Sequence, residues 1–151
     1  MIRSAVLALG LVLTVLAATA VAQESGYRAV ENPYQDGFEF AVNADLQPMV
    51  EIAGVRWTRF GLHVKGDREI VREKEVPVTV ELAFLNTNPD DVRIQVVALL
   101  EDPYGNVLER VECTRFTANS DRLKESIQKF KISGAILESM RRVYLFCEIE
   151  Q

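Results

Sequence analysis

Apolar and polar residues alternate along most of the chain after residue 37, which is the pattern of β-strands with one buried face. The clearest run covers residues 76–84, where every second residue from Val76 to Phe84 is apolar. Pro77 stands near the start of this run. The run over 92–100 alternates in the same way, and Val97 and Leu99 make its second face apolar too. We therefore predict that these two strands form the centre of the fold, and that the second is central in its sheet or covered on both faces.

Shorter apolar runs predict further strands around this pair. They cover residues 38–42, 49–52, 55–64, 107–113, 129–132 and 143–149. Dense turn signals separate the central strands at 86–91 and 101–106, and Gly54 marks a change of phase that indicates a bulge or bend. Helical patterns are short and are limited to 120–125 and 134–140 after the first 22 residues. The pattern predicts an all-β fold, a single antiparallel β-sandwich.

The first 22 residues follow a different pattern. Arg3 precedes an apolar run over 5–18, and Ala20 and Ala22 supply the small residues that a signal peptidase reads. We predict a signal peptide helix over 1–22 that is cleaved after Ala22. The alternative is an uncleaved membrane anchor, but the last third of the segment is only weakly apolar and no basic cluster follows it. The chain is therefore expected to be exported, as a secreted or periplasmic protein.

Removal of this leader leaves 129 residues, a length that suits one domain. We expect residues 23–36 to be a flexible N-terminal segment and residues 37–151 to form the sandwich domain. The only charged side chain of the leader is Arg3, so its removal changes the formal net charge from −5 to −6. A negative chain without basic runs is not typical of proteins that bind nucleic acid or anionic membranes. Contact with a membrane is then expected only through an uncleaved leader.

Export changes how the two cysteines, Cys113 and Cys147, are interpreted. In an oxidising compartment an even pair of cysteines more often forms a disulfide than a metal site or a nucleophile. Alternation places each thiol on the more apolar side of its strand, so the two could meet within the sandwich. We predict a disulfide between them, with two free buried thiols as the alternative.

The region from 76 to 114 resembles a known family. A strand rising to the turn Asp102-Pro103-Tyr104-Gly105-Asn106-Val107 is followed by a descending strand, by Lys129–Ile132 and by a closing strand at Val143–Phe146. This arrangement is similar to bacterial immunoglobulin-like sandwiches of the FxLYD type. The segment 98–102 reads Ala-Leu-Leu-Glu-Asp where that family has its Phe and Tyr. The resemblance implies an immunoglobulin-like fold, and such folds host many functions.

Candidate chemistry is sparse. His63 is the only histidine; alternation directs it to the solvent face, and no acid–base partner is identifiable. Zinc would need three or four ligands at recognisable spacing, and no serine has a Gly-x-Ser-x-Gly context. We therefore expect no metal, no cofactor and no assembled catalytic site.

Carboxylates on or beside strands are the remaining catalytic candidates, although solvated strand faces explain them equally well. They are Glu51, Glu81, Glu101, Asp102, Glu109 and Glu112. A sugar-cleaving pair needs two carboxyl groups at a defined separation, which sequence alone does not establish. The loop Asn86–Asp91 offers oxygen ligands for calcium, but it lacks the regular Asp-x-Asp-x-Asp-Gly form, so we interpret it as a turn.

Tyr144 and Phe146 lie on the opposite face of the last strand from Cys147. If this face is uncovered, the two aromatic residues form an apolar patch suited to a partner. We favour the alternative, in which the strand is buried on both sides.

The sequence therefore predicts a non-catalytic binding or interaction module of the cell envelope, whose partner is a protein or another envelope component. Two other classes stay open: a small extracytoplasmic hydrolase that uses carboxylates, and a carrier that holds an apolar ligand between the sheets. The oligomeric state is left open by the sequence.

The leader gives the first testable prediction. The mass of the protein recovered after export should match a chain that starts at Gln23, because cleavage follows Ala22. Intact mass spectrometry of the secreted or periplasmic fraction checks this. A mature protein that starts at Met1 would contradict cleavage and support an anchor.

Overall fold

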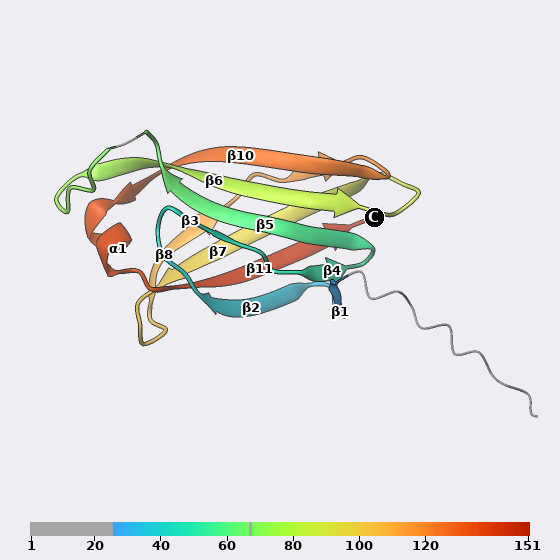
Figure 1. The fold of residues 1–151 in the computed structure, drawn as a ribbon, viewed down its shortest axis with the longest axis horizontal. Helices are drawn as coiled ribbons and strands as arrows, with labels where there is room; N and C mark the ends of the chain where they lie inside the picture. Colours follow the sequence, from blue (N-terminus) through green and yellow to red (C-terminus); the bar gives the residue numbers. More distant parts are fainter. Residues whose placement is uncertain (1–25, 67) are drawn as a thin grey trace, which may run out of the picture.

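The computed structural model describes residues 26–66 and 68–151, and these form a sandwich of two β-sheets (Figure 1). Sheet A has the order β1-β4-β5-β6-β10, with β3 paired to part of β5. Its strands are β1 (Arg28–Val30), β3 (Ala44–Leu46), β4 (Val50–Ile52), β5 (Val55–Val64), β6 (Glu75–Asn86) and β10 (Arg122–Ser133).

Sheet B has the order β2-β11-β7-β8, with β9 paired to the start of β7. Neighbouring strands in both sheets are antiparallel except β1 and β4, which are parallel. The strands of sheet B are β2 (Tyr34–Glu39), β7 (Val92–Glu101), β8 (Val107–Glu112), β9 (Phe116–Ala118) and β11 (Arg142–Glu150).

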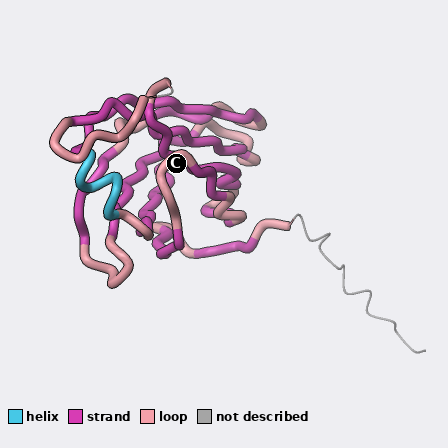
Figure 2. The backbone as a smooth tube through the Cα atoms, turned by 60° about the vertical axis from the view of Figure 1, so that its left-hand side comes forward, coloured by secondary structure: helices cyan, strands magenta, loops and turns pink. Residues whose placement is uncertain are grey.

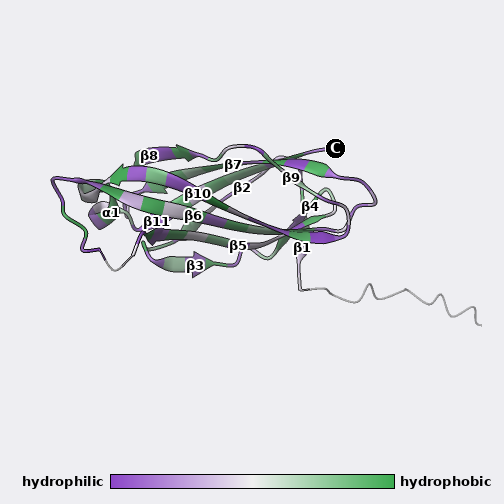
Figure 3. Ribbon diagram, turned by 90° about the horizontal axis from the view of Figure 1, so that it is seen from above, coloured by the Kyte–Doolittle hydropathy of each residue, from purple (hydrophilic) through white to green (hydrophobic). Residues whose placement is uncertain are grey.

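The two strands predicted to be central are central. Strand β6 lies between β5 and β10, and β7 lies between β11 and β8. Their alternation fixes which side chains face inward: in β6, for example, Val80, Leu82 and Phe84 are fully buried. In Figure 3 the strands change between green and purple along their length, as this alternation requires. The all-β sandwich predicted from the pattern is confirmed.

One of the finer predictions about elements differs from the structure, and the bulge or bend predicted at Gly54 is a turn. Residues 122–125 begin β10 instead of a helical turn, because this strand pairs with β6 along its whole length. Tertiary pairing here outweighs a weak local preference for helix. Gly54 lies in the turn between β4 and β5 with φ +76°, and the register shift of β5 falls between Trp57 and Arg59 instead.

The segment expected to be a flexible lead-in is structured where it is described. Residues 28–30 form β1, and β2 begins at Tyr34, whose ring is 5% exposed. Asn32, between them, holds the last strand: its amide donates to the carbonyl oxygen of Ile149 at 2.8 Å and accepts from the N–H of Ile149 at 3.0 Å. The predicted leader over 1–22 lies outside the described residues.

A single short helix closes one end of the described sandwich. Helix α1 (Gly134–Ser139) follows β10 directly, as the pattern over 134–140 predicts, and lies at the end opposite to β1 and the C-terminus (Figures 1 and 2). The N–H of Gly134 donates to the carbonyl oxygen of Lys74 at 2.8 Å. A Cβ on Gly134 would lie 2.0 Å from the carbonyl oxygen of Val71, so only glycine allows this close approach. In the part of the chain that the structure describes, no helix is long and apolar enough to cross a membrane.

A row of aromatic side chains crosses the core and joins the two sheets. Trp57 stacks on Phe84 within sheet A, with ring centroids 5.1 Å apart. At one end of the row, Tyr34 of sheet B meets Trp57 edge-on at 6.4 Å; at the other end, Phe116 of sheet B lies 5.8 Å from Phe84. The indole N–H of Trp57 donates to the carbonyl oxygen of Arg59 at 2.9 Å. The row therefore fills the space between the sheets without leaving the indole donor unpaired.

This packing predicts a large cost for truncating the row. Phe84→Ala should lower the free energy of unfolding by about 3–5 kcal/mol, because it leaves a cavity beside Trp57. Tyr104→Ala is the control, since Tyr104 is 90% exposed, and it should change stability by about 0.5 kcal/mol or less. Urea denaturation of both variants measures the difference. Similar stabilities for the two variants would contradict the central role of the row.

Candidate functional site

Four apolar side chains gather on the outer face of sheet B, and we call them the aromatic patch. They come from the two central strands, because Tyr144 of β11 lies opposite Leu99 of β7, and Phe146 lies opposite Val97. Their inward neighbours on the same strands, such as Leu145 and Ala98, are fully buried in the core. Strands β7 and β11 therefore bury one apolar face in the core, and the aromatic patch is their other, outward apolar face.

No other described element covers the aromatic patch. Strand β2 pairs along the side of β11 and lies in the same sheet. Tyr144, Phe146 and Leu99 are half-buried, and only Val97 is buried, at 7% exposed. The favoured interpretation, burial of this strand on both sides, therefore holds only in part for these residues.

Gln35 and Arg110 complete a surface hollow of about 270 Å³ over the aromatic patch. Gln35 of β2 pairs in register with Phe146, and Arg110 of β8 pairs with Leu99. Each polar residue therefore lies beside the aromatic patch, on the neighbouring strand. Sequence reasoning noted the apolar second face of each central strand separately. It did not join them, because only the register shows that the two faces are adjacent.

The outer face of sheet A has the opposite character. Arg56 pairs with Glu51 at 2.8 Å, and Arg59 lies 3.2 Å from Glu81 and 3.8 Å from Glu125. These ion pairs connect neighbouring strands across β4, β5, β6 and β10. Surface pairs of this kind add little stability, but they make this face well solvated. The outer face of sheet A therefore carries cross-strand ion pairs over β4, β5, β6 and β10.

His63 lies on this charged face, as alternation predicts. Its Nε2 is 3.0 Å from Oδ1 of Asp45, and Thr79 is its neighbour across β6. A histidine–carboxylate pair orients a general base only if a nucleophile or substrate proton is within reach. Among the residues that the structure describes, Asp45 is the one side chain that hydrogen-bonds to His63.

Most of the candidate carboxylates have structural partners. Glu51 and Glu81 form the ion pairs given above, Glu101 lies 3.6 Å from Nε of Arg142, and Glu112 lies 3.3 Å from Arg110. Their positions follow their strands and do not define one cleft.

The candidate carboxylate Asp102 shapes a turn. It accepts hydrogen bonds from the side chain and backbone of Asn106 and from the N–H of Tyr104. These bonds, led by that from the Asn106 amide, hold the pKa of Asp102 below its usual value. Glu109 accepts from the N–H of the next residue, Arg110.

The asparagine-rich loop is held by its own hydrogen bonds. The fully buried Asn86 donates to the carbonyl oxygens of Asp90 and Ala118 at 2.9 and 3.0 Å, and its own oxygen accepts from Asn88. Asn88 in turn donates to the carbonyl oxygen of Ala53. The side-chain amides of Asn86 and Asn88 therefore join three loops by donating to backbone carbonyl oxygens. Calcium is bound by oxygen ligands, so these hydrogen bonds support the interpretation of the loop as a turn. No group of three metal-ligating side chains is found in residues 26–66 and 68–151.

The predicted disulfide is not formed: Cys113 and Cys147 are free, buried thiols. Cys147 lies opposite Val96 on β11, and the N–H of Cys113 donates to the carbonyl oxygen of Val96 from the other side of β7. Two strand spacings, about 10 Å, separate the cysteines, whereas a disulfide needs Cα atoms within about 7 Å. The inward facing was predicted correctly, but β7 stands between the two residues.

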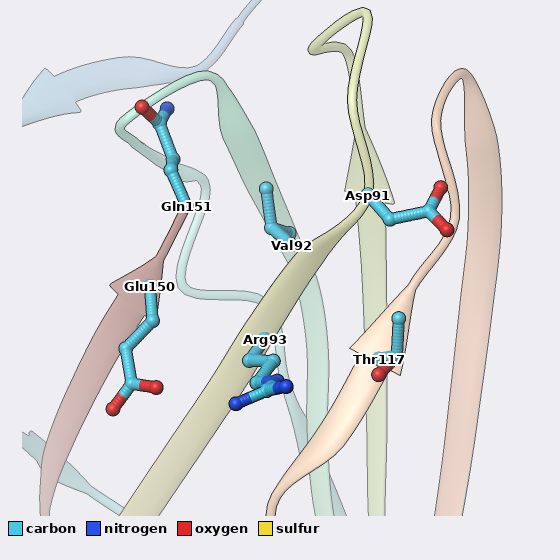
Figure 4. A pocket seen from close by; sticks show the side chains of 6 residues that line it. All are labelled: Asp91, Val92, Arg93, Thr117, Glu150 and Gln151. Carbon is cyan, nitrogen blue, oxygen red and sulfur yellow. The ribbon is translucent and has the colours of Figure 1, made fainter.

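A further hollow lies where the ends of β7, β9 and β11 meet, and its lining residues are labelled in Figure 4. Arg93 lies between Thr117 of β9 and Glu150 of β11 in the sheet register. Glu150 already pairs with Arg115 at 2.9 Å. With acidic and basic side chains mixed in this way, the hollow does not indicate one class of ligand.

Comparison with known proteins gives no family for the chain. The sequence matches no protein-family model, and no curated protein matches it. The architecture is a two-sheet all-β sandwich, which is compatible with an immunoglobulin-like fold in general. The FxLYD type stays a prediction.

The free thiols give a pH-dependent prediction. Burial raises the pKa of Cys113 to about 12 and also raises that of Cys147. The unfolded chain therefore loses its thiol protons at lower pH than the folded one, so the stability tied to them is full below about pH 9 and is lost as pH rises. Above pH 9, the free energy of unfolding should fall by about 1.4 kcal/mol per thiol per pH unit.

Urea denaturation between about pH 8 and 11 measures this slope, and the Cys113→Ala/Cys147→Ala double variant is the control. In the double variant the free energy of unfolding should fall less steeply with pH, because the contribution of the two thiols is absent. Other titrating groups affect the variant and the natural chain alike. Equal slopes would contradict two free thiols and support a disulfide.

Proposed function

We propose that the protein is an exported, non-catalytic β-sandwich that binds a protein partner of the cell envelope through the aromatic patch. The observation that carries this proposal is the contrast between the two outer faces. One face carries ion pairs that link β4, β5, β6 and β10, and on the other the half-buried Leu99, Tyr144 and Phe146 line a hollow. Contiguous exposed apolar side chains with a polar rim are typical of interaction sites.

The position of the aromatic patch suits binding. Its residues lie on β7 and β11, the two central strands of sheet B, so their backbone is held on both sides. A partner would meet side chains that lose little conformational freedom on binding. Tyr144 and Phe146 supply aromatic anchors, and Arg110 and Gln35 supply a polar rim.

The geometry favours this class over the two alternatives. A carrier would need space between the sheets, but Trp57 and Phe84 stack there and both are fully buried. A carboxylate hydrolase would need two converging acids in a cleft, but Glu51, Glu81 and Glu101 each face an arginine.

Export is part of the proposal and rests on the leader over 1–22, with its small residues at Ala20 and Ala22. The resemblance of residues 76–114 to FxLYD-type immunoglobulin-like domains agrees with a binding role. Both lines of support come from the sequence alone.

Photo-crosslinking in the native cells tests the proposal. A photoreactive phenylalanine analogue replaces Tyr144 in the aromatic patch, or Tyr104 in the exposed turn as the matched aromatic control. We expect a discrete cross-linked protein from position 144 and none from position 104, because only the first lies in the patch. Adding Phe146→Ser to the chain with the probe at 144 should reduce the cross-link by about tenfold or more, as loss of an aromatic anchor does.

Equal cross-linking from both positions would indicate non-specific contact and count against the patch. No cross-link at 144, with correct export of the labelled chain, would count against a protein partner at this face.

A further inference from the structure

Strand β10 has an open edge. It runs for twelve residues, Arg122–Ser133, and pairs with β6 along its whole length. In the described part of the chain, β6 is its one strand neighbour. The backbone groups on its other side therefore form an edge that can pair with a further strand.

Two side chains on this edge strand are unusually exposed. Leu123 is 59% exposed and Ile127 is 63% exposed, on the outer face of a sheet that otherwise carries ion pairs there. Lys124, Lys129 and Lys131 also lie on β10, and lysines discourage indiscriminate pairing at sheet edges. A strand that pairs here must match this pattern of charge.

A second copy of β10 matches it. We propose that two copies of the chain associate through β10, antiparallel, with Ile127 opposite the partner's Ile127. In this register Glu125 faces the partner's Lys129, and by symmetry Lys129 faces the partner's Glu125. Directly opposite apolar and opposite-charge pairs both stabilise a sheet. The two copies of sheet A would then form one continuous sheet about a two-fold axis.

Two other symmetric registers place like charges opposite one another. If Leu123 faces the partner's Ile127, then Glu125 lies opposite the partner's Glu125. A shift in the other direction that brings Lys129 opposite the partner's Lys129 has the same fault. Like charges directly opposite destabilise a strand pair, so charge disfavours these two registers, and the one centred on Ile127 is the register that combines an apolar pair with two opposite-charge pairs.

The inner face of β10 does not obstruct this pairing. Gln128 points between the sheets, where it accepts from the N–H of Thr114 at 2.6 Å and donates to the carbonyl oxygen of Thr114 at 2.8 Å. These bonds tie β10 to the other sheet and hold the edge strand in place. The proposed dimer uses the edge of sheet A, so it leaves the aromatic patch on sheet B free in both copies and does not depend on its function.

Analytical ultracentrifugation over micromolar to millimolar concentrations tests the dimer, with the single variants Lys129→Glu and Glu125→Lys. Each variant alone places like charges opposite one another twice, so each should dimerise at least about tenfold more weakly than the natural chain. An equimolar mixture of the two variants should restore association, because every opposite pair in the mixed dimer is again of opposite charge. Both substitutions are at exposed positions, and thermal unfolding checks that each variant folds.

Phe146→Ser, in the aromatic patch, is the control and should leave the dimer unchanged. The proposal is overturned if the natural chain is monomeric throughout, if the mixture fails to associate, or if Phe146→Ser abolishes the dimer while Lys129→Glu does not. The last result would place self-association at the patch instead. The first two outcomes leave cross-linking to an envelope partner from position 144 unaffected.

Discussion

The stack of Trp57 on Phe84 is the contact around which the rest of the molecule is arranged. Both side chains belong to sheet A, yet their edges meet Tyr34 and Phe116 of sheet B, so one continuous row fixes the spacing of the two layers. The outward side chains of β4, β5 and β6 in sheet A include cross-strand ion pairs, whereas the edge strand β10 exposes Leu123 and Ile127. On the outer face of sheet B, Leu99, Tyr144 and Phe146 are half-buried.

Period-two alternation predicted much of this arrangement. It located β6, β7 and β11, and it correctly placed Cys113 and Cys147 on the inner face. Alternation gives the direction of each side chain but not the order of strands in a sheet. The disulfide prediction failed at this step, because two inward cysteines can bond only when no strand separates them. Strand β1 was missed, and the strand predicted over 38–42 overlaps β2 only at its end, because three- to six-residue strands with glycine and charged residues carry little pattern.

The same limit applies to the candidate site. Tyr144 and Phe146 were recognised as a possible surface, and the apolar second face of 92–100 was noted independently. Their union into one patch depends on the register between β11 and β7, a contact between residues more than 40 positions apart. Ion pairs such as Arg59 with Glu81 and Glu125 are likewise set by register and have no signature in the sequence. The sequence could thus identify the outward side chains of each strand, but not which side chains of the neighbouring strands lie beside them.

The place of β11 in its sheet has a consequence for biogenesis. This strand comes last in the chain, yet it lies between β2 and β7 and is the only strand neighbour of β2 among the described residues. Until β11 is in place, sheet B lacks one of its central strands and β2 has no strand to pair with among the described residues. Sheet B therefore closes only after β11 has been made, and topologies dominated by such distant contacts fold slowly.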